Sequence, residues 1–465
     1  MSRTNLIKKL VGVILLSVII LTACGTSATP TAAPQAPATT APENTPVPAQ
    51  PTAVPKPTGK ITVWGWKAAM DVITNSGVLD DFKAAYPDVQ VEIVQYSPTD
   101  VYQKLPLALQ AGTGAPDVAL VESSHLAQIV NLGGLTDLTD LVKPYVPKIN
   151  AYKWPDATLN GKYYALPWDS GPVVFYYRRD VFKAAGLPDD PDSVSKAVAT
   201  WDSYLDVCKT IKQKTGSDCF SLNKANNFAR LYEMMLWQQG LGYYDDQGNV
   251  TVDSPANIAT LEEMKKFWDA GVTSDQLEWT DGWYAELAKP TPADKPIASL
   301  VEASWMGTFL KSWIAGGTAG KWGVALMPAM QAGQARAAND GGSNFVIPDQ
   351  SQNKAAAWAF VEFVLGREQS ELKLFAYSDF IPSLETTYSD ALFIEPDAFF
   401  NGEVARKVYV DVVKTIPTAH VYGQFYSQMN GFVATAIQKV GTGKMSVTDA
   451  LKEAATSIRQ QTGLK

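Results

Sequence analysis

The sequence predicts an α/β protein of two lobes, each built on a mixed, mostly parallel β-sheet flanked by helices. A chain of 465 residues exceeds what one hydrophobic core usually holds, so a second core is expected. Segments with the patterns of strands and helices alternate between residues 60 and 122, as they do in parallel sheets. Residues 162–187 then read as strand, break, strand and helix, which is how a chain passes from one lobe into the next.

The first lobe is expected to begin with a strand at the alternating run KITVWGW, residues 60–66. The predicted elements that follow are a helix at 71–86, a strand at 89–96, a helix at 101–111 and a strand at 117–121. Ligands of such sheets bind beyond the C-terminal ends of the strands. Trp66, Glu122, Ser123 and Ser124 stand at these ends and are candidate cleft residues, whereas Trp64 is expected in the core.

The crossing into the second lobe is predicted where Pro167, Gly171 and Pro172 separate two short strands, 163–166 and 173–177. Trp168 and Asp169 lie in this break, so we expect both side chains to face the cleft.

The later elements follow from spacing and from turn residues. Helices are expected at 200–212, 231–239, 255–270 and 355–366, and strands at 297–301, 322–327 and 345–347. The strand at 297–301 is interpreted as a return to the first lobe, with Glu302, Ser304 and Trp305 at the cleft edge. Gly341 to Asn344 lead into a further crossing, and the last hundred residues are expected to be mainly helical.

Composition excludes several classes of function. The chain has 39 basic and 47 acidic residues, and three of the basic ones lie in the N-terminal segment, so it is a poor candidate for binding nucleic acid. Only two histidines occur, His125 and His420, far apart in the sequence. We therefore expect no metal site, no cofactor and no histidine-based catalysis.

The N-terminus has the pattern of a secretory leader at residues 1–24. Arg3, Lys8 and Lys9 precede an apolar run too short for a comfortable membrane span. Leu-Thr-Ala followed by Cys24 resembles the bacterial lipobox, which implies that Cys24 is lipidated and anchors the chain to a membrane. An ordinary signal peptide with an incidental cysteine is the alternative. Residues 25–59 are rich in Pro, Thr and Ala, and are expected to form an extended tether outside the cell.

The other two cysteines, Cys208 and Cys219, flank the segment KTIKQKTGSD. In an oxidising compartment a disulfide between them is favoured over two buried thiols.

Several motifs occur in an order that resembles a known family. They include GAPDVALVESSH, NGKYYALPWDSGPVVFYYRRDVFKAAGL, TWDSYLDVCKTI, ASLVEASWMGTFL, KWGVALMPA and GGSNFVIPDQSQNKAAAWAFVEFVL. Together they are similar to the extracellular solute-binding proteins of family 1, the maltose-binding type. The resemblance implies a type II periplasmic-binding-protein-like fold with hinge crossings between its lobes. It also implies a monomer, on the outer face of the bacterial cytoplasmic membrane or in the periplasm, that delivers a solute to the permease of an ABC importer.

The expected lobe boundaries follow the crossings. Residues 60–169 are assigned to the first lobe, 170–296 to the second, 297–342 to the first again, and 343–465 mainly to the second with its C-terminal helices.

A carbohydrate is the favoured ligand. Sugar rings present a C–H face that stacks on aromatic side chains and a hydroxyl rim that donates to carboxylates. By resemblance and by position at strand ends, the predicted ligand-binding residues are Trp66, Glu122, Ser123, Ser124, Trp168, Asp169, Asn226, Phe228, Trp305, Asn344 and Tyr422, with Trp283 and Asp379 in addition.

Two other functions stay open. A polyamine would favour carboxylates among aromatics, and a glycerol phosphodiester would favour basic residues, of which the candidate loops hold only Lys67. An anchored extracellular glycosidase would use two carboxyl groups at a suitable separation, and Asp169 and Glu302 are the pair available.

Overall fold

The computed structural model describes residues 56–225 and 229–465. Its first sheet has five strands, in the order β2-β1-β3-β11-β6. These strands are β1 Gly59–Trp66, β2 Val89–Tyr96, β3 Val118–Glu122, β6 Ala165–Pro167 and β11 Ser343–Val346. β1 runs parallel to β2 and β3, whereas β11 is antiparallel to both of its neighbours, β3 and β6. The sheet is therefore mixed, as predicted, with two parallel and two antiparallel pairings.

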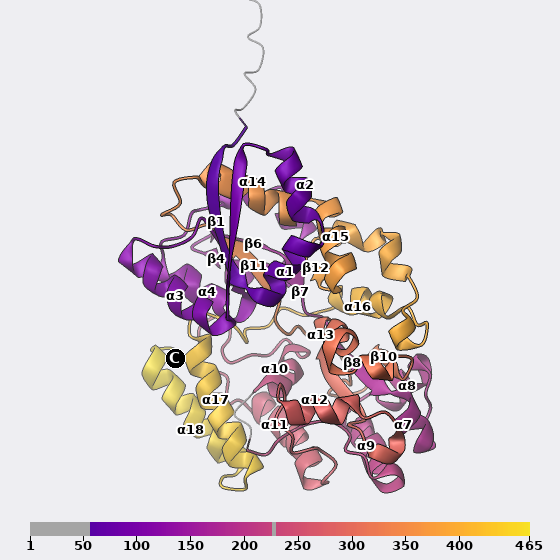
Figure 1. The fold of residues 1–465 in the computed structure, drawn as a ribbon. Coiled ribbons are helices and arrows are strands. Elements are labelled where there is room, and N and C mark those ends of the chain that lie inside the picture. The colour runs from indigo at the N-terminus through magenta and orange to yellow at the C-terminus, as the bar shows by residue number, and fades with distance from the viewer. Residues whose placement is uncertain (1–55, 226–228) are drawn as a thin grey trace, which may run out of the picture. The chain divides into compact units, whose positions relative to one another are not determined.

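Helices cover this sheet and complete what we call the first lobe. They are α1 Lys67–Asn75, α2 Val78–Ala85, α3 Pro98–Ala111, α4 Ser123–Leu132, α5 Thr139–Val142, α6 Trp154–Ala157, α14 Lys354–Leu365 and α15 Glu368–Ser378. All of β3 from Val118 to Val121 is buried, as expected for a strand covered on both faces. In Figure 1, α14 (orange) lies beside α2 (indigo) although the two are far apart in the sequence.

The second sheet has three strands in the order β10-β8-β9, with β8 Val173–Arg178 at its centre. Both neighbours, β9 Ser299–Ala303 and β10 Trp322–Leu326, are antiparallel to β8, so the prediction of a mostly parallel sheet is wrong for this lobe. Alternate side chains of β8 serve two hydrophobic cores: Phe175 and Tyr177 face one, Val174 and Tyr176 the other. This explains why the run VVFYY shows no polar alternation.

The second lobe consists of this sheet and the helices packed on its two cores. They are α7 Arg179–Ala184, α8 Pro191–Ala197, α9 Trp201–Thr215, α10 Arg230–Trp237, α11 Pro255–Asp269, α12 Asp281–Ala288, α13 Trp305–Phe309, α16 Ala405–Val413, α17 Tyr426–Gly441 and α18 Val447–Thr462. A π-helical turn, η4 Leu310–Ile314, directly continues α13. The predicted disulfide is present between Cys208 in α9 and Cys219.

Short elements connect these parts. The strands β4 Thr158–Leu159 and β5 Lys162–Tyr163 form one pair, and β7 Asp169–Ser170 and β12 Ile381–Pro382 form another. The 3-10 turns are η1 Val146–Lys148, η2 Ala151–Lys153, η3 Pro292–Asp294, η5 Gly316–Thr318, η6 Glu385–Ser389, η7 Ala391–Ile394 and η8 Ala398–Phe400.

Two crossing segments run side by side between the lobes. The Gly171 amide donates to Asn339 Oδ1 (3.0 Å), and the Asp340 amide donates back to the Gly171 carbonyl (2.9 Å). The next bond joins the Val173 amide to the Ala338 carbonyl (3.0 Å). A Cβ atom at Gly171 would overlap the Asp340 carbonyl, so this close approach requires glycine. These bonds place residues 171–173 beside residues 338–340.

Strand pairing corrects the later lobe boundaries. Residues 297–342 were assigned to the first lobe, but β9 and β10 both pair with β8 in the second. Residues 343–465 were assigned mainly to the second, but β11 pairs with β3 and β6, and α14 packs in the core of the first. The reason is that a short strand buried on both faces shows the same apolar pattern in either sheet.

Candidate ligand-binding site

A cavity of about 550 Å³ lies between the two lobes, within the range of roughly 300–1,000 Å³ that is typical of small-ligand sites. Both lobes and the second crossing segment contribute to its wall. The lining residues are Trp66, Pro98, Glu122, Ser124, Asp169, Arg230, Glu233, Trp279, Trp305, Phe309, Asp340, Gly341, Gly342, Ser343, Phe380, Tyr422 and Tyr426.

The second lobe contributes an aromatic wall of Trp279, Trp305 and Phe309. The ring centroids of Trp279 and Trp305 lie 5.8 Å apart, and each ring also contacts Phe309, at 6.0 and 5.7 Å. The Trp305 indole donates to the Asp340 carbonyl (3.1 Å), which fixes its orientation. Trp279 has a φ of 65°, a left-handed conformation that is uncommon for a bulky residue and often marks functional sites.

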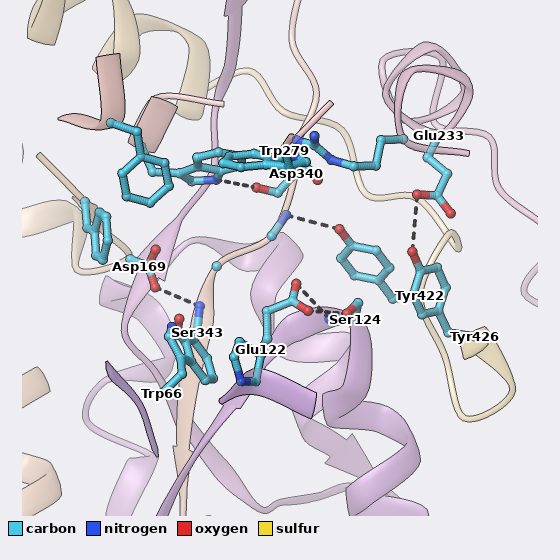
Figure 2. Close-up of a pocket in the computed structure, with 17 residues that line it drawn as sticks. Trp66, Glu122, Ser124, Asp169, Glu233, Trp279, Asp340, Ser343, Tyr422 and Tyr426 are labelled. Carbon is cyan, nitrogen blue, oxygen red and sulfur yellow. Dashed lines mark hydrogen bonds and ion pairs between the residues drawn. The ribbon is translucent and has the colours of Figure 1, made fainter. Parts of the chain in front are cut away.

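The first lobe presents Trp66 toward this wall. Figure 2 shows Trp66, Glu122, Ser124 and Ser343 on one side of the cavity and Trp279 on the other. Trp66 stands at the end of β1, and its ring centroid lies 6.4 Å from that of Tyr102 in α3. A flat ligand can therefore lie between aromatic surfaces of the two lobes.

Arg230, at the start of α10, lies against the aromatic wall and is surrounded by acids. Its guanidinium lies 5.7 Å from the Trp279 ring and 5.5 Å from the Trp305 ring. It pairs with Asp340 (2.5 Å), Glu302 (2.6 Å) and Glu278 (3.3 Å). Burial alone would lower the pKa of Arg230, but these three carboxylates raise it well above its usual value.

The acids around Arg230 exceed its single positive charge. Burial raises the pKa of Glu302 to about 8. Repulsion by the neighbouring carboxylates raises this pKa as well, whereas Arg230 lowers it. Burial also raises the pKa of Glu278. One arginine cannot neutralise all three carboxylates, so this wall of the cavity is electronegative at high pH.

Glu233 is a second buried acid of the cavity wall, on the same helix as Arg230. Its Oε1 atom accepts hydrogen bonds from Tyr243 (2.6 Å) and Asn430 (2.8 Å), and its Oε2 accepts one from Tyr426 (3.2 Å). Burial raises the pKa of Glu233 to about 7, although these hydrogen bonds favour the charged form. The side chain thereby fixes Tyr426 in the cavity wall.

Glu122 and Ser124 form the polar edge of the first lobe. Glu122 is the N-cap of α4, where its side chain accepts from the Ser124 amide (3.5 Å) and from the Ser124 hydroxyl. It therefore acts as a helix cap and as a wall residue at once.

Asp169 and the buried Lys153 support the opposite end of the cavity. Asp169 accepts from the Ser343 amide (2.7 Å), and burial raises its pKa despite the nearby Lys153. Burial lowers the pKa of Lys153 to about 8, while Asp169, Asp156 and Glu122 oppose that shift. Asp169 thereby holds the Ser343 backbone in the cavity wall.

The structure brings six of the predicted site residues to the cavity: Trp66, Glu122, Ser124, Asp169, Trp305 and Tyr422. Ser123 lies behind the wall, where its hydroxyl accepts from Lys153 (2.7 Å). Asn226 and Phe228 lie outside the described residues, as does Cys24. Contact between ligand and these side chains stays a prediction.

Besides Ser123, four predicted residues do not line the cavity. Trp168 is wholly buried and packs on Phe345 and Phe380 in the core of the first lobe. Trp283 is also wholly buried and supports Trp279 from behind, at 5.4 Å.

The two polar residues of this group are engaged elsewhere. The Asn344 side chain donates through Nδ2 to the Val121 carbonyl and the Ser123 hydroxyl, both at 3.2 Å, so it stabilises the pairing of β11 with β3. Asp379 pairs with Lys311 (2.5 Å) and Arg406 (2.6 Å) at the end of α15. Position beside a crossing or a strand end had suggested cleft exposure, whereas packing determined the side-chain direction.

Trp64 is corrected as well. It shares a strand face with Trp66, because alternate residues of a strand point the same way, and it lies half-buried against Tyr96 at 5.1 Å. The core positions of β1 are instead Ile61 and Val63.

Sequence reasoning missed Arg230, Glu233, Trp279 and Asp340. Arg230 and Glu233 belong to a helix whose other residues are mostly core, and Trp279 lies in a loop with no strand-end signal. Asp340 was detectable, since it directly precedes the glycines of the predicted crossing. Arg230, which lies outside the candidate loops, contributes a basic residue to the cavity wall.

Glu302 does not line the cavity; its side chain is 3% exposed and paired with Arg230. Within residues 56–225 and 229–465, no group of three or more His, Cys, Asp or Glu side chains could hold a metal ion. No helix in that part of the chain is long and apolar enough to cross a membrane.

Two lobes, paired crossings and an aromatic cavity between them define a two-lobed solute-binding protein. Residues 77–401 match the model of the bacterial extracellular solute-binding protein family, and the chain belongs to that family. The predicted family resemblance is therefore confirmed.

Individual relatives support the same assignment. The chain is 26% identical to a lactose-binding protein of Rhizobium radiobacter over 407 residues, 85% of this chain and 92% of that one. It is 27% identical to an arabinooligosaccharide-binding protein of Halalkalibacterium halodurans over 382 residues, 80% of this chain and 83% of that one.

A solved structure shows the fold. The ABC transporter associated binding protein of B. animalis subsp. lactis Bl-04, in complex with β-1,6-galactobiose, matches with a TM-score of 0.71 at 23% identity. The match covers 87% of this chain and 97% of that one, and the predicted fold class is confirmed.

Proposed function

We propose that this protein captures an oligosaccharide in the cavity between its lobes and delivers it to the permease of an ABC importer. The observation that carries the proposal is the pairing of aromatic surfaces, Trp66 on one lobe and Trp279 with Trp305 on the other, around a rim of carboxylates. Such a site can stack the C–H faces of sugar rings and accept hydrogen bonds from their hydroxyls. The sugar-binding names of the relatives support the same ligand class.

The delivery mechanism follows from the two-lobed architecture. A ligand that contacts both lobes stabilises the closed arrangement over the open one, and the permease then recognises the closed form. We propose that lipidation at Cys24 and the segment 25–59 keep the protein, as a monomer, at the outer face of the cytoplasmic membrane. Membership of an extracellular family agrees with this location.

A polyamine is the second candidate ligand, because acids outnumber bases in the cavity wall. Glu122, Asp169, Glu233 and Asp340 line it together with one basic residue, Arg230. A phosphodiester is disfavoured, since Arg230 already pairs with three carboxylates. The glycosidase alternative is disfavoured because Glu302, one of its two required acids, is buried outside the cavity wall.

The test is the melting temperature of the purified full-length protein with a series of mono-, di- and oligosaccharides, and with spermidine and glycerophosphocholine as controls. A ligand at a hundred times its Kd adds about 2.7 kcal/mol of stability. We expect an oligosaccharide to raise Tm, and Trp305→Ala to abolish that rise. The matched control Trp313→Ala alters an exposed tryptophan outside the cavity wall and should retain the response to a disaccharide.

If only spermidine raises Tm, the ligand is a polyamine and not a sugar. If no sugar raises Tm, the proposal is contradicted. Chromatography of the incubated sugars separates binding from turnover. Unchanged sugar supports a binding protein, and shortened sugar would identify a glycosidase.

A further inference from the structure

Three aromatic residues occur at four-residue intervals along α13 and η4: Trp305, Phe309 and Trp313. Their ring centroids are 5.7 Å apart between Trp305 and Phe309 and 5.8 Å apart between Phe309 and Trp313. The first two line the cavity, whereas Trp313 lies beyond it and is 53% exposed. We call these three residues the aromatic strip.

The π-helical turn keeps the strip on one face. In an α-helix, a step of four residues exceeds a full turn by about 40°. The wider π turn needs more residues per revolution, so the same step falls short of a full turn there. The step from Trp305 to Phe309 spans α13 and the step from Phe309 to Trp313 spans η4, so the two deviations oppose each other. Trp313 is thereby turned back toward the face of the cavity residues.

Trp313 is also held in place from the side. The ring of Tyr284 in α12 meets it edge-on at 4.9 Å. A single exposed apolar side chain is ordinary on a protein surface. Trp313 differs because it is braced by an aromatic neighbour and continues a row of rings that begins inside the cavity. Trp313 thus stays about half exposed beside Phe309 of the cavity wall.

We propose that Trp313 is an outlying stacking site for an oligosaccharide whose inner units occupy the cavity. The inference rests on the proposed sugar-binding function and extends it to chain length. Rings spaced at 5.7 and 5.8 Å offer successive units of a sugar chain successive stacking surfaces. Saccharides long enough to leave the cavity along the strip gain this contact, and short saccharides do not.

The experiment is calorimetric titration of the full-length protein with arabino-oligosaccharides and β-1,6-linked galacto-oligosaccharides of two to six units. The variants are Trp313→Leu, which removes the ring but keeps apolar bulk, and Trp313→Phe, which keeps a ring. Tyr377→Leu is the matched control, since Tyr377 is 52% exposed and lies in α15, outside the strip. For the longest bound saccharide we expect Trp313→Leu to raise Kd about 3- to 10-fold. The two-unit sugar should bind within about twofold of wild type, and Trp313→Phe should restore most of the loss.

The outcomes separate this inference from the function on which it rests. If wild type binds sugars and Trp313→Leu binds every chain length with the same affinity as wild type, this inference alone is overturned. An equal loss of affinity for short and long saccharides overturns it as well. Unchanged affinity combined with slower import in cells would mean that Trp313 contacts the permease instead. A wild-type protein that binds no sugar of either series overturns both proposals.

Discussion

Replacement of Arg230 by methionine should destabilise the second lobe in a pH-dependent way. The guanidinium is 22% exposed, and its partners Glu302, Asp340 and Glu278 are 3%, 15% and 21% exposed. Methionine preserves much of the apolar volume but leaves these carboxylates facing one another without a cation. Removal of one partner from a buried ion pair costs about 3–5 kcal/mol. In a folded body of this size, one kcal/mol corresponds to about 1 °C in melting temperature, so Tm should fall by about 3–5 °C.

The pH dependence identifies the cause. Burial already raises the pKa of Glu302 to about 8 with Arg230 present, and loss of the arginine should raise it further. A carboxyl group whose folded pKa is raised destabilises the fold as pH increases toward that pKa, because the unfolded chain ionises more easily. The drop in Tm caused by Arg230→Met should therefore be larger at pH 9 than at pH 5, where the carboxyls can take up protons.

The assay is thermal unfolding followed by circular dichroism at pH 5 and pH 9. Arg459→Met is the matched control: its pair with Asp253 lies at the surface, with the two side chains 37% and 25% exposed, and should contribute less than about 1 kcal/mol. Addition of Glu302→Gln to the Arg230→Met variant should recover part of the loss, since it removes one uncompensated charge. The reasoning would be refuted if Arg230→Met melts within 1 °C of wild type at pH 9, or if its drop in Tm is the same at pH 5 and pH 9.

Three further predictions concern stability. Burial raises the pKa of Glu233 from its ordinary 4.5 to about 7, so between pH 4.5 and 8 the wild-type protein should lose about 3 kcal/mol of folding stability that Glu233→Gln does not lose. The measurement is Tm of both proteins at the two pH values. An equal change of Tm with pH in both proteins would contradict the prediction. Cys208→Ser removes a disulfide that spans 11 residues and should lower the free energy of unfolding by about 3 kcal/mol. Reductant should lower Tm of wild type but leave Tm of this variant unchanged. Gly171→Ala introduces a Cβ atom that overlaps the backbone of the neighbouring crossing, so it should lower Tm by several degrees. The control Gly317→Ala should change Tm little, because no atom lies within 4 Å of a Cβ there. Equal changes of Tm in the two variants would show that the crossing can adjust.

The class of fold and the break after residue 167 could be predicted from the sequence because they depend on local patterns. Alternation in residues 60–66 and the β-branched and aromatic run at 173–177 specify strands whatever surrounds them. The prolines and glycine between 167 and 172 interrupt the strand pattern, so the break was indicated locally as well. Strand ends likewise placed Trp66, Glu122 and Asp169 at the cavity, since strand direction determines which edge of a sheet holds the ligand.

Only the tertiary structure decided which sheet each later strand joins and which tryptophans meet the cavity. β9 and β11 are both short and wholly buried, so no alternation of buried and exposed residues indicates which sheet either strand joins. Trp168 and Trp305 both stand beside a crossing, yet core packing buries the first and leaves the second half-exposed. Arg230 acquires its role from acids far away in the sequence. Local pattern specifies an element and the face it buries, but partners distant along the chain are selected by the packing of the whole fold.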